Sequence, residues 1–313
     1  MRTMSNAIRH RHHQSAYLLL TLSSLLWASN WIVGRGVSGE IPPMALTFFR
    51  WLCAIVMLAP FAWPRLRRDW PQIRAHWRIL LVMGSVGVGV HNALAYLGLN
   101  YTTATNGVIL NSFIPVMIVA FSWAFLGERL SRMQLCGVLV SLIGVMTILS
   151  HGSLAALAGF RLNAGDLFIV ASMALWSAYS ILLRRRPTGI DTLAFLFVIA
   201  VVGDCCVLPL YVAETLLGHP MHWTWQNAGV IAVLALFSSI FAYIFWNRGV
   251  AEVGASVAGL FMNLMPVFGV ILAWVFLDER LAAFHVAGIG LILAGIFITS
   301  RHAVIIAPAG AEH

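Results

Sequence analysis

Long apolar runs, separated by short segments that carry the prolines and most of the charges, dominate this sequence. The runs over residues 16–33, 79–99 and 108–126 approach or reach the length of about 20 residues that a helix needs to cross a bilayer core. Hydropathy in a window of about 19 residues predicts ten transmembrane helices. They lie near residues 16–36, 43–63, 78–99, 103–126, 132–150, 164–184, 191–213, 228–250, 254–277 and 282–300. We therefore expect an all-α polytopic membrane protein.

The composition agrees with a membrane environment and argues against nucleic-acid binding. Apolar residues make up 60% of the 313 residues and charged residues only 10%, with a mean hydropathy of +0.88, whereas soluble domains carry about 25% charged residues. The formal net charge of +8 would suggest nucleic-acid binding in a soluble protein. Here every basic residue is an arginine and nearly all lie between apolar runs, so we expect them to orient helices and expect no nucleic-acid partner.

The arginines are distributed unevenly between the two sides of the predicted protein. If the N-terminus is cytoplasmic, 15 of the 19 arginines fall on the cytoplasmic side. The exceptions are Arg35, Arg161 and Arg280 outside and Arg50 within the second span. This excess predicts that both termini are cytoplasmic and that the number of spans is even. Because Arg50 lies near the outer end of its span, we expect its long side chain to extend to the lipid headgroups.

One sequence pattern occurs twice, at a separation of 151 residues. The matching pairs are Ala104 and Ala255, Pro115 and Pro266, Trp123 and Trp274, Glu128 and Glu279, Arg129 and Arg280, Leu130 and Leu281, Gly137 and Gly288, and Gly144 and Gly295. We therefore divide the chain into two five-helix repeats, over residues 1–150 and 151–301, followed by a disordered tail over 302–313. Because five is odd, the second repeat should be inverted in the membrane. Transporters use this architecture to expose one central site to either side.

The repeated motifs also resemble those of a known family. They are Trp27-Ala28-Ser29-Asn30-Trp31, Pro115, Gly127-Glu128-Arg129-Leu130, Gly137 and Gly144 in the first half, and Trp176, Pro266, Asp278-Glu279-Arg280-Leu281, Gly288 and Gly295 in the second. This pattern resembles the EamA family of the drug/metabolite transporter superfamily over essentially the whole chain. The resemblance implies two inverted five-helix repeats and export of amino acids or related metabolites, with aromatic amino-acid exporters of the YddG type as the members to compare first. A bacterial inner membrane is the expected location.

Polar and aromatic side chains at membrane depth indicate where a solute would bind, because a polar group there costs free energy unless it has a partner or lines water. Trp27 and Asn30 share one helix face, and Trp176 and Tyr179 share the corresponding face in the second half. The full set of candidate substrate-binding residues is Trp27, Asn30, His91, Asn92, Tyr96, Asn111, Trp176, Tyr179, Tyr243, Asn247 and Asn263. Rings and amides on corresponding helices suit a small amphipathic solute. For any single residue the alternative is a hydrogen bond between helices.

These candidates fall into two groups along the membrane normal. The outer half of the protein should contain Asn30, His91, Asn92, Tyr96 and Asn111. Because the second repeat is inverted, the inner half should contain Tyr243, Asn247 and Asn263. We expect an outer and an inner vestibule that meet near Trp27 and Trp176 and open in turn.

Other residues suggest coupling, helix shape and packing. Asp204, near the middle of the seventh span, is a candidate proton-coupling group, although a carboxyl neutralised by a buried donor explains it equally well. Pro115 and Pro266 each interrupt a span and should kink it. The four cysteines lie in apolar runs without metal-ligand spacing, so we interpret them as small core residues. Close approach of helices is expected at three pairs of small residues: Gly137 and Ser141, Gly269 and Ala273, and Gly290 and Ala294.

The sequence therefore favours a monomeric exporter of small metabolites that uses no cofactor and no metal. An integral membrane enzyme is one alternative, but the spans contain no histidine-rich metal box and no paired carboxylates on one helix face. A channel is the other alternative, and it would need a selectivity ring, which this sequence does not show.

Overall fold

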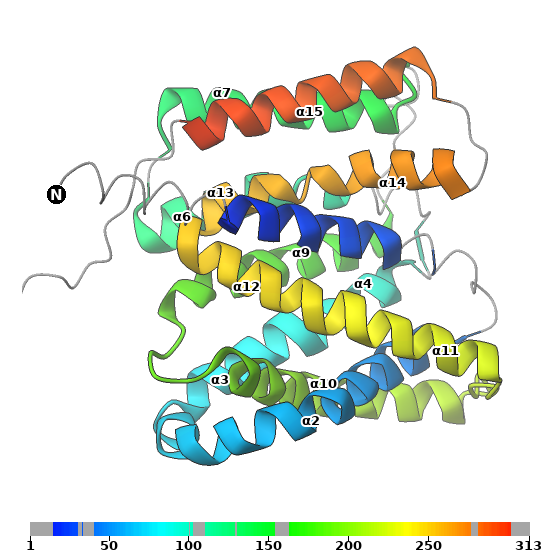
Figure 1. The fold of residues 1–313 in the computed structure, drawn as a ribbon. Helices are drawn as coiled ribbons and strands as arrows, with labels where there is room; N and C mark the ends of the chain where they lie inside the picture. The colour runs from blue at the N-terminus through cyan, green and yellow to red at the C-terminus, as the bar shows by residue number, and fades with distance from the viewer. Residues whose placement is uncertain are drawn as a thin grey trace, which may run out of the picture.

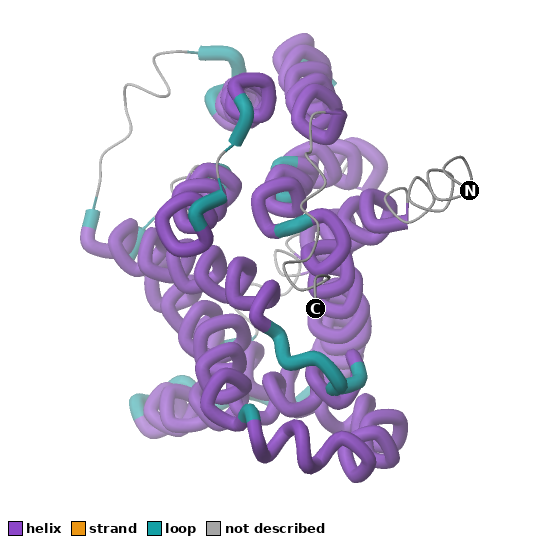
Figure 2. Tube along the Cα trace, turned by 90° about the vertical axis from the view of Figure 1, so that its left-hand side faces the viewer, coloured by secondary structure: helices purple, strands orange, loops and turns teal. Residues whose placement is uncertain are grey.

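The computed structural model describes residues 15–30, 33, 41–99, 101–102, 110–128, 130–153, 163–276 and 281–301. All regular structure in these residues is helical, and the helices lie roughly side by side in a bundle (Figure 1, Figure 2). After a first helix over residues 15–30, the elements are α2 (Pro43–Ala75), α3 (Trp77–Gly84), η1 (Ser85–Val90), α4 (His91–Leu99), α6 (Ile114–Leu126), α7 (Arg132–Leu149), α9 (Ala164–Leu182), η2 (Leu183–Arg185), α10 (Thr192–Leu216), α11 (Trp225–Leu234), η3 (Ala235–Phe241), α12 (Ala242–Val253), α13 (Ala255–Phe261), α14 (Leu264–Phe276) and α15 (Ala283–Arg301). The predicted tail over 302–313 lies outside the described residues.

Within the described residues, eight helices are long and apolar enough to cross a membrane. They cover Pro43–Ala75, Trp77–Ala95, Arg132–Leu149, Ala164–Arg185, Thr192–Leu216, Trp225–Val253, Ala255–Val275 and Ala283–Ser300. The helix α6 is also apolar but shorter. The described residues are thus all-α and agree with a polytopic membrane protein, while the number of ten spans and the orientation of the repeats stay predictions.

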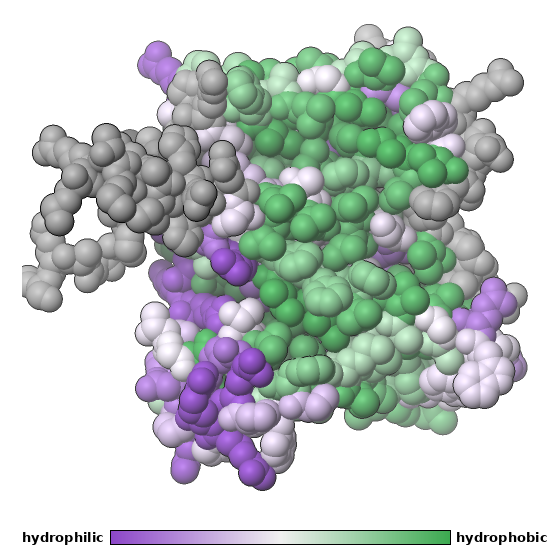
Figure 3. Space-filling model, in the orientation of Figure 1, coloured by the Kyte–Doolittle hydropathy of each residue, from purple (hydrophilic) through white to green (hydrophobic). Residues whose placement is uncertain are grey.

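The outer surface of the bundle is apolar where it would meet lipid. Figure 3 shows hydrophobic residues over the middle of one face and hydrophilic residues gathered at one end. Exposed tryptophans lie on both sides of this zone: Trp63, Trp70 and Trp77 around the turn between α2 and α3, and Trp223 and Trp225 at the start of α11. Since tryptophan is enriched at both membrane–water interfaces, the two groups indicate the two edges of the bilayer.

Ion pairs of the described residues lie near helix ends on one side of the bundle, and those of Arg65 and Arg184 join different helices. They join Arg65 to Asp191 at 3.2 Å, Arg68 to Asp69 at 2.7 Å, Arg248 to Glu252 at 2.8 Å, and Arg184 to Glu128. Glu252 also accepts a 3.4 Å hydrogen bond from the hydroxyl of Ser15, and the Tyr17 hydroxyl donates to the carbonyl oxygen of Ser300 at 3.4 Å. The first described helix therefore begins beside the end of α15 (Figure 1).

Helices α7 and α15 pack against each other through glycines. A Cβ atom on Gly137 would lie 2.6 Å from the carbonyl oxygen of Gly295, and one on Gly144 would lie 2.7 Å from that of Gly288. Residue numbers rise along α7 as they fall along α15, so the two helices are antiparallel. Of the three expected small-residue contacts, only that of Gly137 and Ser141 lies at such an interface, because a Cβ on Gly269 or Gly290 would meet nothing within 4 Å.

Two π-helical segments interrupt α-helices at corresponding positions of the two halves. The segment η1 (Ser85–Val90) lies between α3 and α4, and η3 (Ala235–Phe241) lies between α11 and α12. A shift of 151 residues brings η1 onto the last six residues of η3. A π-helical turn accommodates an extra residue and leaves backbone carbonyls without their usual partners, and such turns are frequent at functional sites.

Breaks in the helices precede the two central prolines. Ser112 and Phe113 form a turn before α6, in which Pro115 occupies the first turn. Met262 and Asn263 form the corresponding turn between α13 and α14. Because proline has no N–H group and its ring clashes with the preceding turn, a new helix can start just before it but an existing one cannot continue unchanged. The structure therefore has a full break, rather than a bend, at each position.

Candidate functional site

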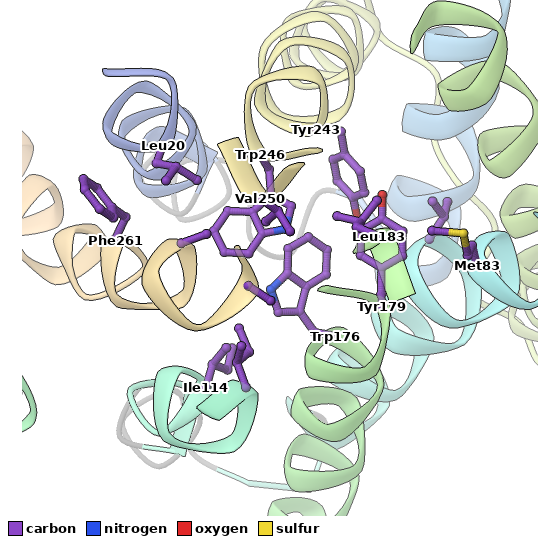
Figure 4. Packing of buried hydrophobic residues seen from close by; sticks show 14 of the residues in the cluster. Leu20, Met83, Ile114, Trp176, Tyr179, Leu183, Tyr243, Trp246, Val250 and Phe261 are labelled. Atoms are coloured by element: carbon purple, nitrogen blue, oxygen red, sulfur yellow. The ribbon is translucent and has the colours of Figure 1, made fainter. Parts of the chain in front are cut away.

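Six aromatic side chains form a cluster in the interior of the bundle: Trp27, Trp51, Trp176, Tyr179, Tyr243 and Trp246, here called the aromatic cluster. The rings of Trp27 and Trp176 meet edge to face with centroids 5.2 Å apart. Tyr243 and Trp246 each lie 5.6 Å from Trp176. Figure 4 shows how the rings from α9 and α12 face one another. Edge-to-face and tilted contacts at these distances are favourable for aromatic rings, so residues far apart in the sequence hold one another in place.

The π-helical segments provide hydrogen-bond acceptors for this cluster. The indole nitrogen of Trp27 donates to the carbonyl oxygen of Ser238 in η3 at 3.1 Å. In the reciprocal arrangement, the hydroxyl of Tyr243 donates to the carbonyl oxygen of Gly87 in η1 at 2.8 Å. Each half of the chain thus contributes a ring that is anchored on the π-helix of the other half.

Two further polar tips of the cluster, those of Tyr179 and Trp176, are bonded within the second half, whereas the indole nitrogens of Trp51 and Trp246 are buried without a partner. The hydroxyl of Tyr179 donates to Oδ1 of Asn247 at 2.7 Å. The indole nitrogen of Trp176 donates to Sδ of Met262 at 3.2 Å, in the turn that precedes α14. The helix break at this turn is therefore in direct contact with the centre of the cluster.

His91 is held at the edge of the aromatic cluster. Its ring centroid lies 5.1 Å from that of Trp176. The hydroxyl of Ser172 donates to the carbonyl oxygen of His91 at 2.9 Å and lies 2.9 Å from the Nδ1 atom of His91. Because a hydroxyl has one proton to give, Nδ1 must carry the hydrogen in this second contact. The Nε2 atom of a neutral His91 is then an acceptor.

The structure brings most, but not all, of the predicted site residues together. His91, Trp27, Trp176, Tyr179, Tyr243 and Asn247 form one connected set. Asn263 bonds instead to the hydroxyl of Ser141 on α7 at 2.9 Å. Asn92 donates to the carbonyl oxygen of Val88 at 2.7 Å. Asn30 and Asn111 are partly buried, and the side chain of Tyr96 lies outside the described residues.

The two predicted vestibules differ in exposure. Asn30, His91, Asn92 and Asn111, assigned to the outer vestibule, are all partly exposed, as is Trp27. Tyr243, Asn247 and Asn263, assigned to the inner vestibule, are buried, with exposed fractions of 4%, 1% and 2%. In this conformation the inner group is packed into the bundle and the outer group is not.

Two charged residues, Arg50 and Asp204, are buried inside the bundle. The prediction that Arg50 extends to the headgroups was wrong, because its side chain is 5% exposed. Its Nη2 atom donates to Oδ1 of Asn92 at 3.3 Å, and its Nε atom has no hydrogen-bond partner. Asp204 on α10 is also 5% exposed, and its Oδ1 atom is unpartnered. The only sequence signal for Arg50 was a charge within an apolar run, and hydropathy does not reveal the direction of a side chain.

None of the four cysteines is buried in the core of the bundle. Cys136 and Cys205 are exposed on the surface of the bundle, and Cys53 and Cys206 are partly buried, so the interpretation of all four as core residues was wrong. Thiols are apolar enough to face lipid, which removes the need to bury them. Among the described residues, no three His, Cys, Asp or Glu side chains come together to hold a metal ion.

Known proteins share both the sequence pattern and the fold. The model of the EamA-like transporter family matches residues 14–150 and, a second time, residues 163–301. The uncharacterized transporter YyaM of Bacillus subtilis is 27% identical, covering 92% of this chain and 94% of its own. Protein PecM of Dickeya dadantii is 22% identical, covering 87% and 88%. A crystal structure of a protein with 20% identity has a TM-score of 0.77 over 93% of this chain and 98% of that chain, which shows a shared fold.

Proposed function

This chain belongs to the EamA-like transporter family, and we propose that it is a secondary carrier that exports small amphipathic metabolites, chiefly amino acids including aromatic ones, by alternating access. It is a multi-pass membrane protein, related to proteins named as transporters. We expect it to function as a monomer in a bacterial inner membrane. The observation that carries the proposal is the aromatic cluster, in which Trp27 and Trp176 of the two halves are in contact and each half is anchored on the π-helix of the other.

We infer that the chain forms two inverted repeats with ten spans and cytoplasmic termini, and three features support the repeats. The family model matches the chain twice. The π-helices occur at corresponding positions. In the contact of α7 with α15, Gly137 meets Gly295 and Gly144 meets Gly288. Since Gly288 and Gly295 correspond to Gly137 and Gly144 at the offset of 151, this antiparallel crossing has the pattern expected of a two-fold axis in the membrane plane.

Alternating access is supported by the unequal exposure of the two vestibules. The partly exposed group around His91 and Asn92 gives the site an open side. On the other side, the buried group around Asn247 is covered, and the ion pair of Arg184 with Glu128 joins the end of α9 to the end of α6. We infer that the structure corresponds to an outward-open state, and that the reverse state separates this ion pair.

The aromatic cluster supports an amphipathic solute. Its rings offer apolar faces, and the partly exposed amides and His91 offer hydrogen bonds at its edge. Sites for small molecules typically combine an apolar lining with a few placed polar groups. Asp204, buried near this edge, is the candidate for coupling export to protons.

Counterflow in proteoliposomes tests this function. Liposomes that contain the purified protein are preloaded with one unlabelled amino acid, and the same labelled amino acid is added outside. A carrier should accumulate label transiently by exchange, and we expect this for aromatic amino acids first. Absence of exchange for every amino acid would refute the amino-acid assignment, and flux without counterflow would indicate a channel.

A further inference from the structure

Four polar side chains from three helices converge beside the aromatic cluster: Arg50 on α2, His91 and Asn92 on α4, and Asp204 on α10. We call these four residues the polar site. Arg50 and Asn92 are hydrogen-bonded. Asp204 follows Gly203, whose carbonyl oxygen would lie 2.7 Å from a Cβ atom on Gly89 in η1, so α10 passes directly beside the segment that leads into His91 and Asn92.

Much of the bonding capacity of the two charged groups is unused. A guanidinium has five N–H donors, yet Nε of Arg50 is buried without a partner. Oδ1 of Asp204 is likewise buried without a partner. Of the ion pairs formed by the described residues, none joins Arg50 to Asp204. A buried charge without a partner is costly, and a ligand that bonded to both groups would remove that cost.

The packing of α2 on α10 sets how far apart Arg50 and Asp204 lie along the bundle. The carboxylate of Glu214, near the end of α10, accepts hydrogen bonds from the backbone N–H groups of Met44 and Ala45 at 3.1 and 2.9 Å, so the start of α2 is fixed there. At a rise of 1.5 Å per residue, Arg50 lies about 9 Å and Asp204 about 15 Å along the helices from this end. The two residues are therefore offset by about 6 Å along the bundle, a distance that their side chains and one small head group can span together.

The polar site is continuous with the aromatic cluster. The guanidinium of Arg50 lies 5.6 Å from the ring centroid of Trp51, whose ring is 4.9 Å from that of Tyr243. On the other side, His91 lies 5.1 Å from Trp176. His91 and Asn92 are only partly buried, so the polar site has an open edge. A solute that bound its charged head here would have apolar rings within reach for its side chain.

We propose that the polar site binds the zwitterionic head of the exported solute, with its carboxylate on Arg50 and its ammonium on Asp204. Guanidinium binds carboxylate with paired, charge-assisted hydrogen bonds. The acceptor Nε2 of a neutral His91 and Oδ1 of Asn92 complete the surroundings of the head. The solute side chain then lies against the aromatic cluster. The inference rests on the proposed carrier function and narrows its substrate class to α-amino acids, excluding simple acids and amines.

Three probes that share one side chain test the polar site: L-phenylalanine, 3-phenylpropanoate, which lacks the ammonium, and phenethylamine, which lacks the carboxylate. Their affinities are measured from the rise in melting temperature of the intact protein in detergent. The wild type should bind L-phenylalanine at least about tenfold more tightly than either analogue, because each charge-assisted bond contributes about a factor of ten.

Substitution of the two charges should alter the specificity in opposite directions. In Arg50→Gln, phenethylamine should bind as well as L-phenylalanine. In Asp204→Asn, 3-phenylpropanoate should bind as well as L-phenylalanine. Arg78→Gln is the matched control, because Arg78 is exposed at the end of the bundle, and it should keep the wild-type order. Arg50→Lys, which keeps the charge but not the paired geometry, serves if Arg50→Gln does not fold, and it should weaken binding of both carboxylates while sparing the amine.

A structural role for these residues gives a different result. Equal loss of all three probes in both variants, or an unchanged preference for L-phenylalanine, would overturn the proposal, as would a wild type that binds none of them. The counterflow assay separates this outcome from failure of the carrier function. If the protein exchanges another solute and shows no preference for zwitterions, the carrier function would be supported and the zwitterion site refuted. If Arg50→Gln and Asp204→Asn change the specificity as predicted but no solute is exchanged, the polar site would be supported and the carrier function refuted.

Discussion

Trp27 and Trp246 both belong to the aromatic cluster, yet their indole nitrogens have different surroundings. The Trp27 nitrogen donates to the carbonyl oxygen of Ser238 in η3, whereas the Trp246 nitrogen is buried without a partner. Both rings pack against Trp176. The two residues therefore separate the contribution of a ring from that of a hydrogen bond to a π-helix.

Phenylalanine at these two positions should have different effects on transport. Trp27→Phe leaves a carbonyl of η3 unpaired, at a cost of about 1–3 kcal/mol, and should reduce amino-acid counterflow about tenfold. Trp246→Phe loses no hydrogen bond and should transport like the wild type. Alanine is unsuitable, because removal of a ring as buried as that of Trp176 would cost about 3–5 kcal/mol of stability. Equal rates for the two variants, at equal amounts of folded protein, would refute a role for the Trp27 bond.

The sequence identified the chemistry of individual residues better than their partners. Trp27 and Trp176 were recognisable because they occupy corresponding positions, and they are in contact. The position of Arg50 near the end of a span was compatible with two directions for its side chain. The outcome depends on Asn92 from another helix, which one-dimensional hydropathy does not show.

At the scale of elements, the packing of α7 on α15 depends on the absence of side chains at four glycines. A Cβ atom on Gly144 of α7 would have no room, whereas one on Gly290 of α15 would meet nothing within 4 Å. Helix spans and the proline breaks follow from hydropathy and from the chemistry of proline. The π-helices have no comparable sequence signal, because their extra residue is stabilised by contacts with Trp27 and Tyr243 from other helices.

Alanine at these two glycines should change stability with opposite sign. Gly290→Ala gains helix propensity and should stabilise the protein by up to about 1 kcal/mol. Gly144→Ala has the same propensity gain, but its Cβ forces the helices apart and should cost about 1–3 kcal/mol net. Thermal unfolding in detergent measures both. If Gly144→Ala stabilised the protein, the contact between α7 and α15 at Gly144 would have room for a side chain, contrary to this account.

At the scale of the whole molecule, the account depends on two halves with opposite orientation. Hydropathy predicted ten spans, and eight of the described helices qualify by length and composition. The difference lies at the predicted spans near 16–36 and 103–126, of which the structure describes only residues 16–30, 33 and 110–126. The arginine distribution predicts the orientation, which no contact inside the bundle can define.

Reporter fusions test this orientation. A reporter fused after Arg301 should be cytoplasmic, and one inserted between Leu154 and Asn163 should be external, because only three of the 19 arginines are predicted outside. Alkaline phosphatase and green fluorescent protein fusions report opposite sides and control for each other. Two fusions on the same side would contradict an odd number of spans in each repeat.

The central claim is that the two vestibules open in turn, and accessibility of single cysteines tests it most directly. In a background in which the four native cysteines are replaced, Asn111→Cys and Asn263→Cys are treated with a membrane-impermeant thiol reagent on either side. Asn111 is partly exposed and Asn263 is 2% exposed, so without solute Asn111→Cys should react from outside and Asn263→Cys should be slow. A transported amino acid should slow the first and accelerate the second from inside. Rates that move in parallel, or an Asn263→Cys that never reacts, would contradict alternating access.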